Sequence, residues 1–386
     1  MSPYTHYLVH DFFKKKEFNE IYISVFIMTF AESLIEIFIP IYLFQLGYSI
    51  PIIIFFYFLV SLFFIIFSLY GANIVSKIGV KHSILISIPF LAVYYIALNY
   101  IIFSNFIFFA LPALLAIRMI FYNFGFHLNY IKHSDKEKRG KELSTIGILT
   151  TLSTATAPIL ASIIIIKFGF DMLFLVGIIL LIIGTIPLFL TKDTYERINI
   201  NTKKTISYIF DKKSLPRAMS FTGYAIESII DRIIWPIFLI ILLLTVEKVG
   251  TVVSFSLLSS ILVFYLIGKL TDRQNKTKLI KIGTFFCFFG WIGRLLVYNQ
   301  FTVLLVDSYK NVSSKILQLP WSAKSYDIAA KEGYFSFIVT REIIFNLSRV
   351  IILPIIMIIF YIDFFPFIIT FIIAAISTLL YPLLSE

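Results

Sequence analysis

The chain has 386 residues, of which 59% are hydrophobic and 14% are charged, and its formal net charge is +11. Ordinary soluble domains are about 45–50% apolar and about 25% charged, so this composition excludes a soluble fold of this size. The single cysteine excludes a disulfide-stapled secreted domain, and 16 glycines with 13 prolines exclude a collagen-like chain. The class that remains is a polytopic α-helical membrane protein.

Apolar stretches long enough to cross a bilayer follow one another along the whole chain. A helix needs about 20 apolar residues to cross the hydrocarbon layer, and on that criterion we predict twelve membrane spans. The spans lie near 21–45, 50–75, 82–103, 106–130, 143–166, 171–191, 217–245, 249–270, 279–298, 300–322, 335–361 and 364–384. Transmembrane barrel strands would alternate apolar and polar residues, and the stretch from Met172 to Leu190 does not. The predicted fold class is therefore all-α with twelve transmembrane helices.

The basic residues predict the orientation and the division of the chain. Most of the 33 Lys and Arg residues precede the first span or follow even-numbered spans, and the positive-inside rule places such segments in the cytoplasm. We expect both termini to be cytoplasmic in a plasma or inner cell membrane, with 1–20 as a leader and no cleavable signal peptide. The polar stretch 192–216 is predicted to be a solvated cytoplasmic loop. It separates an N-terminal six-helix bundle (21–191) from a C-terminal one (217–386).

Short motifs recur in the two halves. Glu32 and Glu36 precede Pro40 in span 1, as Glu227 and Asp231 precede Pro236 in span 7. The acids are offset by 195 residues and the prolines by 196, and Pro158 and Pro354 are again 196 apart. Such an internal repeat is typical of transporters built from duplicated bundles.

With this repeat the chain resembles the major facilitator superfamily, whose twelve spans form two pseudo-symmetric six-helix bundles joined by a basic loop. The family signature, Gly-x-Leu-Ala/Ser-Asp-Arg-x-Gly-Arg-Lys, lies between spans 2 and 3 and is repeated between spans 8 and 9. The second copy reads here Gly268-Lys269-Leu270-Thr271-Asp272-Arg273, with Asn275 in place of a glycine. The first copy keeps Gly79 and Lys81 but has Ala72 for the first glycine and Ser76 for the aspartate.

The resemblance implies a conformational role for this loop motif, namely for Gly79, Lys81, Gly268, Asp272 and Arg273. It places Asp272 against the start of span 5, near Ser144, in the outward-open state. A carboxylate there would gain about 0.3–1 kcal/mol from the dipole of the facing helix. The alternative is an ordinary charge at the membrane edge.

Ionisable side chains deep in the spans are the candidate functional residues. Each costs about 2.5–3.5 kcal/mol at a helix centre on insertion scales, so each needs a partner or water. They gather in spans 1, 4, 7 and 10, which line the central cavity in the resembled family. The candidate substrate- or proton-binding residues are Glu32, Glu36, Arg118, Glu227, Asp231, Asp307, Lys310 and Lys315. Arg294, Arg341, Glu342 and Arg349 fall outside this pattern, and the sequence offers no explanation for Arg349.

The spacing of the acids favours a proton-coupled carrier. Glu32 and Glu36 lie on one helical face, as do Glu227 and Asp231, and two acids so close disfavour simultaneous ionisation. The arrangement is similar to drug/proton antiporters of the superfamily, which carry acids in span 1 and an arginine in span 4. The alternative is that the acids only form ion pairs with Arg118, Arg232, Lys310 and Lys315 and so hold the two bundles together. We prefer this alternative for Asp307, Lys310 and Lys315.

The sequence therefore predicts a secondary active transporter that moves a small organic solute by alternating access, coupled to protons. The acidic first half favours efflux of amphiphilic or cationic compounds. One alternative is uptake of a neutral or anionic metabolite bound by Arg118, Lys310 and Lys315, and another is a non-transporting receptor or assembly protein, which Ser76 favours. No Walker loop or metal-binding cluster is evident, so we expect no enzyme activity, cofactor or metal. The expected partners are the solute, protons and lipid, without nucleic acid, and the chain is expected to be a monomer.

Overall fold

The computed structural model describes residues 16–133, 139–190 and 214–384, and within these ranges the chain is helical without any β-strand. Most of the predicted leader and central loop lies outside the described residues. In chain order the helices are α2 (Lys16–Glu36), α3 (Phe38–Gln45), α4 (Ile50–Ile78), α5 (Val80–Leu98), η1 (Ile101–Phe103), α6 (Asn105–His133), α7 (Arg139–Leu190), α9 (Leu215–Leu243), α10 (Val246–Leu258), α11 (Ile261–Arg273), α12 (Lys276–Gly293), η3 (Arg294–Leu296), α13 (Gln300–Glu332), α14 (Tyr334–Ile362), α15 (Pro366–Thr378) and η4 (Tyr381–Leu383).

Nine segments of the described chain are long and apolar enough to cross a membrane. One of them, Arg139–Phe189, has 51 residues, which at about 1.5 Å per residue is far longer than one crossing needs. It is interrupted at Gly169, whose φ of 81° is accessible to glycine without steric cost. Helices α9 and α13 are not among the nine, because charged residues are frequent along both of them. The all-α membrane fold is confirmed, and the count of twelve spans stays a prediction.

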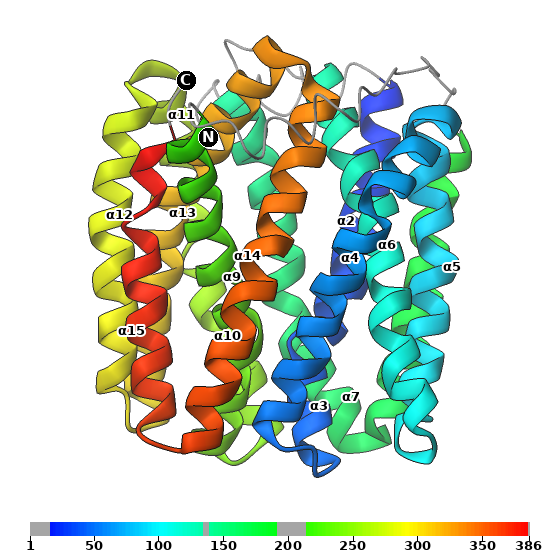
Figure 1. Cartoon of the computed structure of the whole chain (residues 1–386), viewed down its shortest axis with the longest axis vertical. Coiled ribbons are helices and arrows are strands. Elements are labelled where there is room, and N and C mark those ends of the chain that lie inside the picture. The colour runs from blue at the N-terminus through cyan, green and yellow to red at the C-terminus, as the bar shows by residue number, and fades with distance from the viewer. Residues whose placement is uncertain (1–15, 134–138, 191–213, 385–386) are drawn as a thin grey trace, which may run out of the picture.

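Both described ends of the chain lie at one end of the molecule, where α2 begins and η4 ends (Figure 1). We call this end the terminal side and the opposite end the far side. Helix α11 lies at the terminal side (Figure 1). Helix α7 begins beside the end of α11, since the backbone N–H of Gly140 donates a hydrogen bond to the side chain of Asp272. The positive-inside rule predicts that the terminal side faces the cytoplasm.

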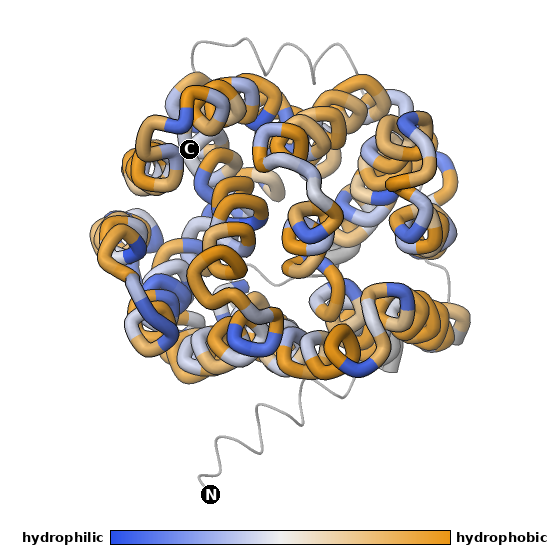
Figure 2. Tube along the Cα trace, turned by 90° about the horizontal axis from the view of Figure 1, so that it is seen from below, coloured by the Kyte–Doolittle hydropathy of each residue, from blue (hydrophilic) through white to orange (hydrophobic). Residues whose placement is uncertain are grey.

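Large apolar side chains cover the outer surface of the bundle. Examples that are more than half exposed are Ile66, Tyr70, Phe189, Leu262, Ile351 and Ile358. Seen end-on from the far side, the helices are dominated by hydrophobic residues (Figure 2). Such a surface would drive aggregation in water, whereas in a bilayer it contacts lipid and the helices satisfy their own backbone groups.

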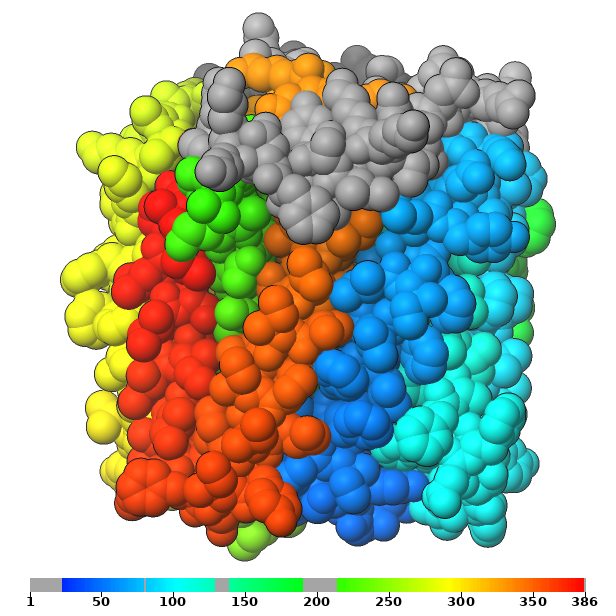
Figure 3. Space-filling model, viewed as in Figure 1, coloured from blue at the N-terminus to red at the C-terminus, as the bar shows by residue number. Residues whose placement is uncertain are grey.

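The two halves of the chain meet along two sets of helices. Helix α14 packs along α4, which Figure 3 shows as orange beside blue, and α7 packs against α10 and α11. Small residues permit this close approach, as expected for membrane helices. A Cβ added to Gly250 in α10 would lie 2.5 Å from the carbonyl oxygen of Pro158 in α7.

The prolines of the repeat shape the helices that hold the central charges. Helix α2 ends at Glu36 and α3 begins at Phe38, because Pro40 has no N–H to bond the carbonyl of Glu36. Pro236 stands inside α9, four residues after Arg232. Relative to these two prolines, Glu36 and Arg232 therefore occupy equivalent positions, each at a gap in the backbone hydrogen bonding, whereas the acid motif itself aligns Glu36 with Asp231.

Candidate functional site

An ion pair joins the two halves at these equivalent positions. Nε of Arg232 lies 3.1 Å from Oε1 of Glu36, so α9 of the second half contacts the end of α2 in the first. The side chains are 42% and 47% exposed. Because an ion pair facing lipid would be costly, we infer that water between the halves accounts for this exposure.

The second acid of α2 is paired within the first half. Glu32, one turn before Glu36, forms an ion pair with Arg118 of α6, and both side chains are largely buried. The Arg118 guanidinium also lies 4.4 Å from the ring centre of Tyr122. Both acids that were expected to make the first half acidic therefore have an arginine partner.

A buried cluster of five charged residues lies inside the second half. Arg294 contacts Asp231 at 2.6 Å and Asp307 at 2.5 Å. Lys310 contacts Asp231 at 2.6 Å and Glu227 at 3.2 Å. The cluster joins α9, α13 and the end of α12, and it contains three acids and two cations.

Neutral groups complete this second-half cluster. The indole of Trp291 and the hydroxyl of Tyr381 donate to Glu227 at 3.1 and 2.8 Å, and Ser256 donates to Asp307 at 2.7 Å. The Arg294 guanidinium stacks 3.9 Å from the ring centre of Trp235. With several partners for each carboxylate, the cluster acts as a rigid polar core of the second half.

Arg294 fell outside the pattern of charged spans predicted from the sequence, although the surplus of deep acids in spans 7 and 10 was a signal that could have indicated it. Lys315 was predicted to pair with an acid. Lys315 forms no ion pair within the described ranges, and its Nζ lies 5.2 Å from the ring centre of Phe264. Its electrostatic neighbours are Lys310, Asp231 and Glu227, so it offsets the negative charge of the cluster.

Polar contacts between the halves close the terminal side. Asp272 accepts hydrogen bonds from the backbone N–H groups of Gly140 (2.6 Å) and Lys141 (2.8 Å) at the start of α7, where the helix dipole favours a carboxylate. Arg139 contacts Asp327 of α13 at 2.6 Å, and Lys276 contacts the same carboxylate. We call these six residues the terminal clasp.

The other members of the loop motif lie near this level. Arg273 ends α11, and Ser144 donates to the carbonyl of Phe264 at 2.6 Å beside Gly268. In the first copy, Gly79 has a φ of 82° between α4 and α5, where Lys81 follows. The Ser76 hydroxyl bonds the carbonyl of Asn73 in its own helix, at 2.7 Å. The two copies of the loop motif thus differ: Asp272 of the second copy bonds the other half, whereas Ser76 of the first copy bonds its own helix.

A second layer of contacts between the halves lies next to the terminal clasp. Nδ1 of His127 in α6 is 2.7 Å from the hydroxyl of Tyr326 in α13. The Asn123 amide donates to Glu342 of α14 at 3.4 Å, and Glu342 also pairs with Arg341 at 3.1 Å. Sequence reasoning took His127 as a solitary hydrogen-bonded residue and gave the α14 pair no role.

Replacing Asp272 with alanine is expected to open the terminal side. The loss of a charged helix cap costs about 0.5–2 kcal/mol, which corresponds to a shift of roughly twofold to thirtyfold toward the open state. The readout is the rate at which a hydrophilic maleimide labels a cysteine at Asn123, because the native Cys287 is buried. Ser76→Ala is the control, and equal labelling rates in both variants would contradict the prediction.

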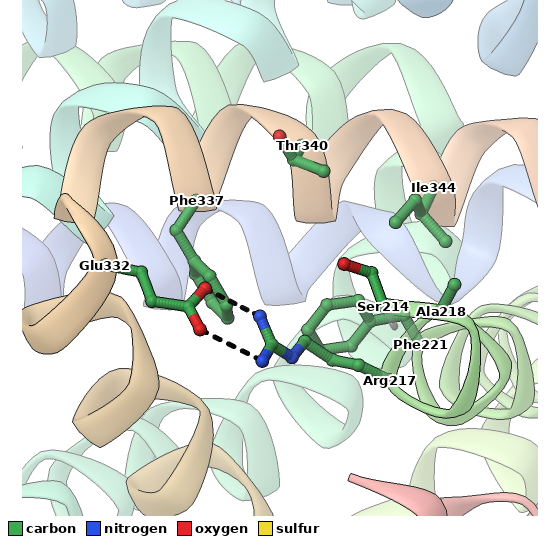
Figure 4. A pocket seen from close by; sticks show the side chains of 8 residues that line it. All are labelled: Ser214, Arg217, Ala218, Phe221, Glu332, Phe337, Thr340 and Ile344. Atoms are coloured by element: carbon green, nitrogen blue, oxygen red, sulfur yellow. Dashed lines mark hydrogen bonds and ion pairs between the residues drawn. The ribbon is translucent and has the colours of Figure 1, made fainter. Parts of the chain in front are cut away.

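A small hollow lies beside the first turns of α9, nearer the terminal side than the central charges. It is lined by Ser214, Arg217, Ala218, Phe221, Glu332, Phe337, Thr340 and Ile344 (Figure 4). Arg217 and Glu332 form a two-pronged ion pair across it, with distances of 2.7 and 3.0 Å. Arg217 is fourteen residues before Asp231, or roughly 20 Å along the helix, so this hollow is separate from the central charges.

Comparisons with known proteins agree with this architecture. The sequence profile of the Major Facilitator Superfamily matches residues 21–308. Among solved structures, the human organic anion transporter MFSD10 (TETRAN) superposes with a TM-score of 0.70, over 95% of this chain and 98% of that one. The two sequences are 10% identical, so the likeness shows the fold alone. No curated protein matches the sequence significantly.

Proposed function

The chain belongs to the Major Facilitator Superfamily, which makes it a secondary transporter, and we propose that it moves a small organic solute by alternating access, coupled to protons. The observation that carries this proposal is the Glu36–Arg232 pair. It joins the two halves at the equivalent proline gaps, and both side chains remain nearly half exposed. A charged, wet centre between two bundles is where a carrier of this architecture binds its solute.

The distribution of contacts fits two rocking bodies. The second-half cluster stays within one half, whereas the terminal clasp and the His127 layer consist of contacts between the halves. Opening the terminal side would break these contacts and leave the cluster intact. The structure thus represents a state in which the terminal side is closed.

Glu32 and Glu36 are the proton carriers in this proposal. The acids of the second-half cluster each have several hydrogen-bond or ion-pair partners within one half. Glu32 and Glu36 have one basic partner each. Protonation of Glu32 would leave Arg118 without a counterion. The free energy of this unpaired charge differs between the open and closed arrangements of the halves, so protonation shifts the equilibrium between them.

The sequence favoured a cationic solute because it predicted free acids in the first half. This argument no longer holds, because both acids of α2 form ion pairs with arginines. MFSD10 is described as an organic anion transporter, but at 10% identity we do not transfer its cargo. The proposal assigns no direction of transport. The cytoplasmic placement of the terminal side, the cell membrane and the monomeric state belong to the proposal, and the sequence is their only support.

The test measures distances between spin labels at two exposed terminal-side lysines, Lys77 of the first half and Lys278 of the second, in lipid nanodiscs. We expect two distance populations whose ratio differs between acidic and neutral pH. Glu32→Gln mimics the protonated acid, so this variant should keep the low-pH ratio throughout. Glu332→Gln, which removes a carboxylate paired at the terminal edge, is the matched control and should respond as the wild type.

Two outcomes of this measurement would contradict the proposal. A single distance at every pH would favour the non-transporting receptor. Two populations with no pH dependence in the wild type would leave alternating access standing and exclude coupling through Glu32.

A further inference from the structure

Arg349 of α14 is a buried cation without an acidic partner. Its exposed fraction is 8%, and within 16–133, 139–190 and 214–384 it forms no ion pair. Its Nη2 lies 3.4 Å from the hydroxyl of Ser228 in α9, and its Nε has no hydrogen-bond partner. A guanidinium carries five donors, so most of its binding capacity is unused. A buried charge in this condition is costly unless a ligand compensates it.

The surroundings of Arg349 add positive charge. Among side-chain charges, Arg232 acts on it most strongly, and that interaction is repulsive. Arg232 lies one turn after Ser228 on the same face of α9, and it contacts Glu36 through Nε, which leaves its two Nη groups for another acceptor. The acid that acts on Arg349 is Glu342, which already pairs with Arg341.

The inventory of deep charges also leaves Arg349 unbalanced. Arg118 and Glu32 offset each other, as do Arg232 with Glu36 and Arg341 with Glu342. In the second-half cluster three acids face two cations, and Lys315 supplies the third positive charge nearby. Arg349 is the remaining charge, so the centre of the described structure is one charge too positive.

We propose that Arg349, together with Ser228 and the Nη groups of Arg232, binds a carboxylate group of the transported solute. Two guanidinium groups and a hydroxyl are suited to a planar anion, because each guanidinium donates two parallel hydrogen bonds to its oxygens. The half-exposed Arg232 gives the anion access from the wet centre, and the anion supplies the missing charge. This inference rests on the proposed transport function and specifies the class of solute.

The test uses purified protein in nanodiscs and the melting temperature as readout, since a ligand that binds the native state raises it. The probes are acetate, hexanoate and benzoate, each compared with its neutral amide and its amine analogue at equal ionic strength. We expect at least one carboxylate to stabilise the wild type saturably while its amide and amine do not. Equal effects of carboxylate and amide across all three pairs would overturn the proposal, as would saturation of the site by chloride alone.

The variants separate binding from folding. Arg349→Gln removes an uncompensated charge, so without ligand it should melt at or above the wild-type temperature, while its carboxylate affinity should fall roughly tenfold to hundredfold. Arg349→Lys keeps the charge without the two-pronged geometry and should bind with intermediate affinity. Arg217→Gln, whose partner Glu332 is far from the centre, should lose stability and keep the carboxylate response. An unchanged response in Arg349→Gln would refute the site.

The two proposals fail separately. If the spin labels show two populations but no carboxylate is preferred, the anion site is wrong and transport stands. If carboxylates bind through Arg349 but the labels report a single distance, the site stands and transport is wrong.

Discussion

Replacing Arg294 with methionine should lower the free energy of unfolding by about 3–5 kcal/mol, the range measured when one partner of a buried ion pair is removed. Its side chain is 1% exposed and contacts both Asp231 and Asp307. Methionine would leave two carboxylates facing each other in a low-dielectric core without their shared cation. The measurement is unfolding by titration with a denaturing detergent in mixed micelles.

Two further variants control this prediction. Arg217→Met breaks a pair whose acid is 28% exposed, so the expected loss is about 1 kcal/mol or less. Adding Asp307→Asn to the Arg294→Met variant should recover part of the stability, because one uncompensated charge disappears. If Arg294→Met unfolds at the same detergent fraction as Arg217→Met, the second-half cluster does not stabilise the fold as we describe.

Replacing Asp327 with asparagine is expected to shift the chain roughly tenfold to hundredfold toward the state with an open terminal side. Asp327 is the acceptor for Arg139 of the first half, at 2.6 Å, and a charge-assisted hydrogen bond contributes about 1.5–3 kcal/mol. The bond exists only while the halves are in contact, so its loss changes the equilibrium between states. Maleimide labelling of a cysteine at Asn123 reports the shift.

Glu332→Gln is the control for this change. Glu332 lies on the same helix α13, but its partner Arg217 belongs to the same half. Labelling should therefore stay near the wild-type rate. Equal acceleration in both variants would show that any lost carboxylate on α13 opens the protein, which would contradict a specific role for the terminal clasp.

The sequence located the deep charges but could not pair them. Arg118 and Arg232 are among the cations that the sequence offers as partners of the deep acids, but the sequence does not say which acid each of them contacts. Arg294 was set aside although it contacts two candidate acids. Each of these contacts joins helices distant in the chain, and the choice of partner depends on helix rotation and crossing, which hydropathy does not encode.

The same reason explains Arg349 and the α14 pair. From the sequence, Arg349 was one more charge in an apolar span; only the packing of α14 against α9 shows that the neighbouring acids are already paired. The loop motif around Asp272 was recognisable from residue order, because a helix end and its flanking charges are local features. Its contact with the start of α7 is a property of the closed assembly.

The sequence by itself determined the all-α membrane class, because the bilayer imposes its thickness and its lack of hydrogen-bonding partners on each segment separately. Tertiary structure alone decided which acids are compensated, which cation is left over and which side is closed. These properties arise from the sum of charges that several helices bring into one desolvated volume, and no single segment contains that information.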